Sequence, residues 1–162
     1  MFNNKIESVP NEIGQLVNLR SLFLKENKLT QLPDKFELLK KMETIDLVSN
    51  KLCSIPPSLS FMRDITEISF ACNDLRELPE ALFFLPLKKL SLIGNKIEEL
   101  PPTISRLASL SCLILDNNQL RYLPATIDSL HSLVQLSVKS NRLTSLPGDL
   151  SGFVNLRELA CK

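Results

Sequence analysis

The chain has 162 residues, of which 44% are hydrophobic and 23% charged, a size and composition that fit one folded domain and exclude a disordered chain. A net charge of +1, from 19 basic and 18 acidic residues, excludes strong long-range attraction to nucleic acid or to an anionic membrane. No apolar run reaches the ~18–20 residues of a membrane-spanning helix, and the N-terminus shows no secretory signal peptide.

Cysteine usage favours an intracellular compartment. The cysteines have no Cys-x-x-Cys spacing and no clustering, which favours reduced thiols over a disulfide framework or a zinc site. None of the twelve asparagines lies in a glycosylation acceptor sequence, which agrees with that reading without requiring it. We therefore expect a cytoplasmic protein that holds no metal and no other cofactor. The four cysteines are Cys53, Cys72, Cys112 and Cys161.

Asparagine and proline recur at a fixed period along the whole sequence. Successive asparagines of one column are separated by 23 residues, with a single spacing of 22. A proline stands six residues after each of them, and two columns in phase indicate a repeat architecture. The columns are Asn4, Asn27, Asn50, Asn73, Asn95, Asn118 and Asn141, and Pro10, Pro33, Pro56, Pro79, Pro101, Pro124 and Pro147.

Apolar residues fill the positions between these columns, so that each unit reads Leu-x-x-Leu-x-Leu-x-x-Asn-x-Leu-x-x-Leu-Pro-x-x-Ile-x-x-Leu. This pattern is identified as the leucine-rich repeat, and about seven units cover the chain from end to end. The resemblance implies a solenoid of the α/β class, with a curved parallel β-sheet on the concave side and short helical or 3₁₀ segments on the convex side. One copy consists of Leu19, Leu22, Leu24, Asn27, Leu29, Leu32, Pro33, Phe36 and Leu39.

Each unit predicts a short strand, a turn and a return segment, in that order. The alternation in Leu-x-Leu is that of a strand, so the leucines face inward and the residue between them faces outward. The asparagine lies where the chain turns away from the strand, and its amide is suited to bond backbone groups of its own and neighbouring turns. The proline fixes φ at the end of that turn. Ile-x-x-Leu has helical spacing but is short, so we expect irregular or 3₁₀ structure there.

The single 22-residue spacing has an identifiable position. Seven residues separate Pro79 from Leu87, whereas eight separate Pro33 from Met42. Because Leu85 still holds its column, the deletion falls just after it, where a proline closes the loop. This position lies on the back of the solenoid, where loop length varies at little cost.

The two ends of the sequence are abrupt. Met1 and Cys161 each occupy the position of the last strand leucine of a unit, and neither end shows a polar or cysteine-bounded cap. Terminal repeats of a solenoid normally need a polar outer face. We therefore expect residues 1–162 to form a single domain that is a fragment lacking both caps. The alternative is a short protein whose ends are covered by a partner.

The outward positions of the concave sheet are the predicted binding surface, because solenoids use their extended concave face for partners. The middle outward column reads Phe23, Asp46, Ser69, Ser91, Ile114, Ser137 and Ala160. The residues that we predict to contact a protein partner are Arg20, Phe23, Lys25, Asp46, Val48, Glu67, Ser69, Lys89, Ile93, Ile114, Asp116 and Gln135.

Charged residues form one grouping on this surface. Glu43, Asp46 and Glu67 come from the second and third strands, beside Lys88 and Lys89 of the fourth. Neighbouring strands lie ~4.8 Å apart, so these charges are close enough to pair. The grouping is either a charged anchor for a partner or a solvated face that is balanced internally.

Apolar residues form the second grouping. Phe23, Val48, Ile93 and Ile114 point outward among polar residues. Exposed aromatic and branched side chains in such a setting are typical of interface anchors. Scattered exposed apolar residues are also ordinary, and the pattern alone leaves both interpretations open.

The sequence offers no catalytic constellation. His131 is the only histidine and falls in a loop on the back edge, so no serine or cysteine has a histidine on its own face to act as a base. Cys72 and Cys112 face the sheet side but lie two repeats apart, beyond disulfide reach. With no basic stripe, no tryptophan and one tyrosine, Tyr122, nucleic-acid binding is not indicated either. We predict a protein that is not an enzyme.

The Leu-Pro-x-x-Ile form of the repeat resembles intracellular proteins of the Ras-pathway scaffold type. Similar units occur in the Erbin/Scribble polarity proteins and in the plant Ras-group-related repeat proteins. Residues 4–10, Asn-Lys-Ile-Glu-Ser-Val-Pro, and 95–101, Asn-Lys-Ile-Glu-Glu-Leu-Pro, carry the resemblance. It implies a cytoplasmic signalling scaffold that holds a protein such as a small GTPase or a phosphatase. The resemblance does not identify any particular contact residue in this sequence.

Two other functions remain open from the sequence. The chain could be the targeting domain of a larger enzyme, such as a kinase, a GTPase or a ubiquitin ligase, and a catalytic domain beside it would show this. It could also be part of an extracellular recognition receptor, which a signal peptide or paired cysteine caps in a longer chain would indicate.

Overall fold

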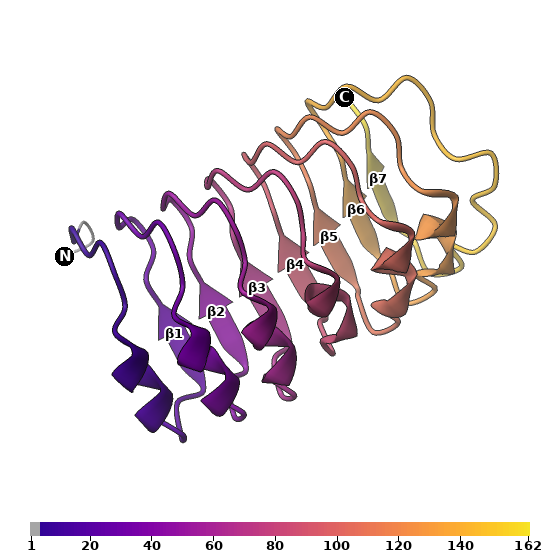
Figure 1. Ribbon diagram of the computed structural model, residues 1–162. Coiled ribbons are helices and arrows are strands. Elements are labelled where there is room, and N and C mark those ends of the chain that lie inside the picture. Colours follow the sequence, from indigo (N-terminus) through magenta and orange to yellow (C-terminus); the bar gives the residue numbers. More distant parts are fainter. Residues whose placement is uncertain (1–3) are drawn as a thin grey trace.

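The computed structural model describes residues 4–162, and they form a solenoid whose strands lie side by side along one face (Figure 1). The predicted role of Met1 lies outside the described residues. One sheet contains seven parallel strands, and each pairs with the next along the chain, which confirms the predicted fold with about seven repeats. The strands are β1 (Ser21–Phe23), β2 (Thr44–Asp46), β3 (Glu67–Ser69), β4 (Lys89–Ser91), β5 (Cys112–Ile114), β6 (Gln135–Ser137) and β7 (Glu158–Ala160).

The strands pair in the register that the repeat predicts. Leu22 lies opposite Ile45, and Ile45 opposite Ile68, so equivalent positions of successive units stack on one another. Each strand begins one residue before the first leucine of its Leu-x-Leu motif and ends one residue before the second. The second leucine still belongs to the ladder, since the Leu24 N–H donates to the Asp46 carbonyl at 2.9 Å.

Within residues 4–162, six 3₁₀ helices form the opposite side, as predicted from the short Ile-x-x-Leu segments. The proline of each unit precedes its helix in an extended conformation, and its carbonyl accepts the first helical bond, as from the Ile104 N–H to Pro101 at 3.0 Å. Proline suits this place because it donates no N–H there. The helices are η1 (Asn11–Gln15), η2 (Asp34–Leu38), η3 (Pro57–Phe61), η4 (Glu80–Phe84), η5 (Pro102–Arg106) and η6 (Ala125–Ser129).

The last repeat replaces its helix with turns. There the Asp149 carboxylate accepts the Ser151 N–H at 2.8 Å, a local bond that competes with helix formation. The same bond from Ser151 lowers the pKa of Asp149.

The structure places the one-residue deletion on the helical side, directly after η4. Leu85, which ends that turn, has ψ of 147°, whereas Leu39 and Leu107 at the same position have ψ of 57° and 56°. Pro86 follows Leu85, and a residue that precedes proline is pushed out of the helical region into extended conformation. The shortened loop is therefore absorbed behind the sheet, and β3 and β4 pair without a break.

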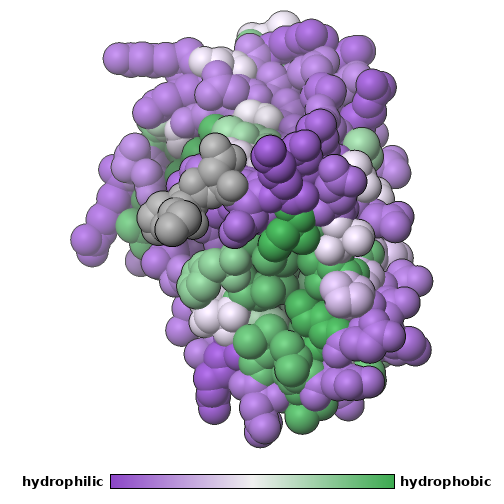
Figure 2. All heavy atoms as spheres, turned by 90° about the vertical axis from the view of Figure 1, so that its left-hand side faces the viewer, coloured by the Kyte–Doolittle hydropathy of each residue, from purple (hydrophilic) through white to green (hydrophobic). Residues whose placement is uncertain are grey.

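The inward columns build one continuous apolar core. Phe36, Phe70 and Phe83 are among its largest fully buried side chains. Burial decreases toward both ends, where Leu22 and Leu143 are only partly covered. Figure 2, viewed from the N-terminal end, shows hydrophobic residues gathered in the lower part of that surface.

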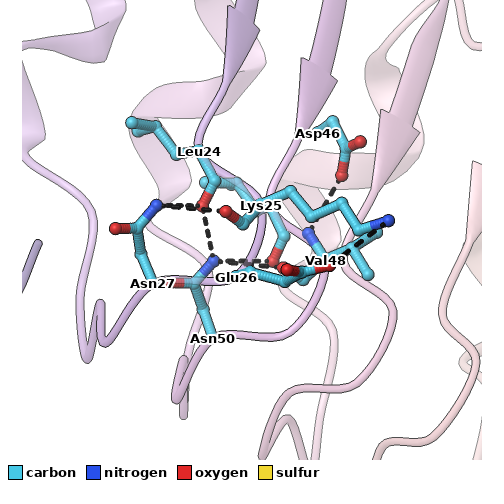
Figure 3. Close-up of polar contacts among 8 residues, drawn as sticks. Leu24, Lys25, Glu26, Asn27, Asp46, Val48 and Asn50 are labelled. Carbon is cyan, nitrogen blue, oxygen red and sulfur yellow. Dashed lines mark hydrogen bonds and ion pairs between the residues drawn. The ribbon is translucent and has the colours of Figure 1, made fainter. Parts of the chain in front are cut away.

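The asparagine column ties each repeat to the one before it. The Asn73 Oδ1 accepts the Leu52 N–H of the preceding repeat at 2.9 Å, and its Nδ2 donates to the carbonyls of Leu47 (3.0 Å) and Phe70 (2.9 Å). Figure 3 shows the amides of Asn27 and Asn50 directed at the carbonyl of Leu24 in the same way. Equivalent bonds are made by Asn95, Asn118 and Asn141.

From Asn27 to Asn141, the residue before each asparagine of the column adopts a left-handed backbone conformation. The φ angles of this column lie between 53° and 65°, a region that disfavours most side chains. The conformation lets the N–H of the same residue continue the ladder, as from Ser49 to the Ala71 carbonyl at 2.9 Å. Only one of these residues is glycine; the column is Glu26, Ser49, Cys72, Gly94, Asn117 and Ser140.

We expect Ser49→Val to lower the free energy of unfolding by about 1–2 kcal/mol, because a β-branched side chain is strained at this φ. Ser49→Gly should raise the same quantity, since glycine has no Cβ to strain. Chemical denaturation of both variants measures the difference. If valine and glycine give equal stability, the backbone at this position is not left-handed in solution.

Candidate functional site

The outward side chains of β1 to β5 line a shallow hollow of about 340 Å³ on the sheet side. Its shape follows from the sizes of the residues in the middle outward column. Phe23, which is 66% exposed, stands at one end and Ile114 at the other. The small side chains of Ser69 and Ser91 lie between them. The hollow is thus a dip between two apolar ends, about four strand spacings or ~19 Å apart.

Charged groups on this surface are largely paired with one another. The Lys89 Nζ lies 2.9 Å from the Glu67 carboxylate, and Arg20 forms an ion pair with Glu43. The hydrogen bond to Glu67 raises the pKa of Lys89. These pairs favour the internally balanced face over the charged anchor.

Aspartates on the sheet side are held by backbone groups. The Asp46 carboxylate accepts the Val48 N–H at 3.0 Å, as Figure 3 shows. The Asp116 carboxylate accepts both the Ser137 hydroxyl (2.6 Å) and the Lys139 N–H (2.8 Å). Ser137 is 3% exposed, so this position of β6 is covered and not open to a partner.

The hollow collects part of the predicted contact set. Six of the predicted residues line it: Phe23, Asp46, Glu67, Ser69, Lys89 and Ile114. The other six lie outside it: Arg20, Lys25, Val48, Ile93, Asp116 and Gln135. Val48 and Ile93 are half-buried beside the turn, so the apolar grouping of the sequence is split between the hollow and the turn edge.

Six residues outside the predicted contact set also line the hollow. Three of them, Thr44, Ser91 and Cys112, are at outward positions, and the other three, Ile45, Ile68 and Leu90, are core residues of β2, β3 and β4. Thr44, Ser91 and Cys112 occupy the same outward columns as the predicted residues. Cys112 donates to the Gln135 side-chain oxygen at 3.2 Å, and Gln135 in turn donates to Glu158 at 3.0 Å. A row of polar contacts therefore crosses β5, β6 and β7.

The described residues, 4–162, offer little for bond-making chemistry. Within them, no three histidine, cysteine, aspartate or glutamate side chains lie close enough together to hold a metal ion. Burial raises the pKa of the Cys112 thiol, which keeps it protonated and weakly nucleophilic. The ring of His131 is exposed, with its Nδ1 2.8 Å from the Gly152 carbonyl oxygen. No helix in the same range has the length and apolar character needed to cross a bilayer.

Comparison with known proteins agrees with the repeat geometry. Residues 2–52 match the family model described as leucine rich repeat. The chain also superposes over 99% of its length on a leucine-rich-repeat protein of Leptospira interrogans, with a TM-score of 0.82 and 32% identity. The chain is a leucine-rich-repeat solenoid. A search of curated proteins finds no match.

Other leucine-rich-repeat structures share this shape. The functional domain of InlJ from Listeria monocytogenes, which includes a cysteine ladder, matches 98% of the chain with 25% identity and a TM-score of 0.81. Toll from Drosophila, in complex with Spatzle, matches 98% with 27% identity and a TM-score of 0.77. The chain covers 47%, 33% and 25% of the Leptospira, Listeria and Drosophila chains, so it spans less than half of each. Its own four cysteines occupy four different columns of the repeat and are all free.

Proposed function

We propose that this leucine-rich-repeat solenoid is a non-catalytic scaffold that binds a protein partner on its concave sheet. The observation that carries the proposal is the hollow over β1 to β5, with the apolar residues Phe23 and Ile114 at its ends. The charged residues that line it between these ends are Asp46, Glu67 and Lys89. Exposed apolar side chains around a dip are typical of the anchors of protein interfaces.

The partner belongs, in this proposal, to intracellular signalling, and the scaffold acts in the cytoplasm. Support comes from the resemblance to Ras-pathway scaffold repeats, which points to a small GTPase or a phosphatase. Free thiols in four separate columns fit a reducing compartment better than an oxidising one. Among the similar structures, Toll is seen in complex with Spatzle, and a plant peptide hormone receptor with its peptide.

Truncation of the two ends of the hollow tests the proposal. We expect the Phe23→Ala/Ile114→Ala variant to bind its partner at least about tenfold more weakly than the parent, because a few buried apolar anchors dominate such interfaces. Affinity capture from cytosol, followed by titration of the captured protein, measures this ratio. Val154→Ala is the matched control, since Val154 is 71% exposed but lies in the last repeat, outside the hollow.

Unchanged affinity of the Phe23→Ala/Ile114→Ala variant would move the binding site away from the hollow. Loss of affinity in the Val154→Ala control would place it at the C-terminal end of the solenoid.

A further inference from the structure

Three adjacent 3₁₀ helices end on exposed apolar residues. Leu38, Phe61 and Phe84 are the last residues of η2, η3 and η4, and they are 44%, 50% and 59% exposed. They recur at intervals of 23 residues, so they occupy equivalent positions in successive repeats, and the helices that carry them contact each other. We name this row on the convex side, formed by Leu38, Phe61 and Phe84, the apolar stripe.

A cation limits the apolar stripe at one end. The equivalent residue of η5 is Arg106, whose guanidinium carbon lies 4.4 Å from the centre of the Phe84 ring. This cation–π contact holds an exposed ring in place. The stripe is therefore three repeats long and one side chain wide.

Charges of opposite sign flank the apolar stripe. Asp34 and Glu80, the first residues of η2 and η4, precede it within the helices, whereas Lys40 and Arg63 follow it by two residues. All four side chains are exposed. Within residues 4–162, none of the four forms an ion pair, so each is free to meet an opposite charge on a partner.

We propose that the apolar stripe binds an amphipathic α-helix of a partner protein, lying along the solenoid axis, with basic residues on one flank and acidic residues on the other. Repeats advance by ~4.8 Å at the sheet and somewhat more on the outer side of a curved solenoid. One turn of an α-helix advances 5.4 Å. Apolar residues three and four positions apart on such a helix thus meet successive residues of the stripe.

Other occupants fit the apolar stripe less well. Alternate side chains of an extended strand advance by ~6.6 Å and fall out of step with the stripe within two repeats. A stable dimer of this chain would need about 800 Å² from each copy, more than a row of three half-exposed side chains presents. The two charged flanks give a helix electrostatic complementarity that a purely apolar surface would not.

A designed peptide provides the probe. It is a helix of about 18 residues with leucines in one stripe, lysines on one flank, glutamates on the other and a single tryptophan. Because the chain contains no tryptophan, fluorescence of the peptide reports binding directly. We expect Phe61→Ser/Phe84→Ser to weaken binding at least about tenfold. Phe23→Ser, which removes an exposed phenylalanine from the concave sheet, is the matched control and should leave it unchanged.

A second test of the proposal changes only charged residues, in the peptide or in the protein, and leaves every apolar residue in place. Peptides with lysine on both flanks or glutamate on both flanks should bind the parent at least about threefold more weakly than the mixed peptide. Lys40→Glu/Arg63→Glu makes both flanks of the stripe acidic, so this variant should prefer the all-lysine peptide.

Equal binding of all three peptides by the parent would overturn the proposal, as would full binding by the Phe61→Ser/Phe84→Ser variant. Loss of binding in Phe23→Ser would show that the peptide occupies the concave hollow instead. That outcome contradicts the convex site and leaves the proposed function of the concave sheet standing.

Discussion

Asn73→Ala should lower the free energy of unfolding by about 1–3 kcal/mol, the cost of leaving a buried donor without a partner. The donor is the Leu52 N–H, which bonds to the Asn73 Oδ1. The carbonyls of Leu47 and Phe70 each keep a second amide donor in the variant, Asn50 of its own repeat for Leu47 and Asn95 of the next repeat for Phe70. They therefore remain hydrogen-bonded. The stability effect is thus concentrated on a single N–H. Urea denaturation of parent and variant measures it.

Asn11→Ala is the control for this experiment. Asn11 is exposed at the start of η1, and the same change of side chain there should alter stability by less than about 0.5 kcal/mol. Equal unfolding of the Asn73→Ala variant and the parent would contradict the inter-repeat role of the asparagine column.

Gly152→Ala should destabilise the C-terminal repeat by about 1–3 kcal/mol, the usual cost of forcing extra volume into a filled space. A Cβ at this position would lie 2.8 Å from the backbone carbon of Asp128 and would also collide with the Asp128 carbonyl oxygen. Backbone atoms of the neighbouring repeat cannot rotate away as a side-chain tip can. Because a repeat contacts only its neighbours, the loss should appear first as local opening of the last repeat.

Gly148→Ala is the matched control, since a Cβ there has no heavy atom within 4 Å. Amide hydrogen exchange over residues 143–162 compares the two variants, and the Gly152→Ala protein should exchange faster. If both exchange at the parental rate, the close approach to Asp128 does not persist in solution.

Much of this fold could be predicted because each repeat position has one dominant physical reason. Inward leucines, the asparagine turn and the short helical spacing recur seven times, so a single substitution such as Met42 does not obscure its column. The deletion after Leu85 was also locatable, since the leucines on either side kept their columns.

Other features of the structure depend on contacts between neighbouring repeats, and the residue pattern within one repeat does not predict them. The left-handed column contains Glu26, Ser49 and Cys72, residue types that give no signal for a positive φ. The carboxylate of Asp116 turns toward a neighbouring strand and buries Ser137, which an alternating pattern cannot express.

The apolar stripe was visible in principle. Leu38, Phe61 and Phe84 interrupt a column that holds polar or small residues in the other repeats, namely Gln15, Arg106, Ser129 and Gly152. Residues on the convex side of a solenoid are ordinarily variable. Three apolar residues there are therefore not a clear sign of a binding surface in the sequence alone. Exposure in the structure distinguishes these three from the buried residues that follow them, Leu39, Met62 and Leu85.

Site-specific photo-cross-linking tests the concave binding surface most directly. A cross-linking phenylalanine analogue would replace Ser91 on the floor of the hollow or, as a control, Ser132 on an exposed loop of the helical side. With protein in cytosolic extract, we expect one cross-linked partner from position 91, lost when Phe23→Ala and Ile114→Ala are added, and none from position 132. A partner that cross-links from position 132 and not from position 91 would contradict binding on the concave sheet.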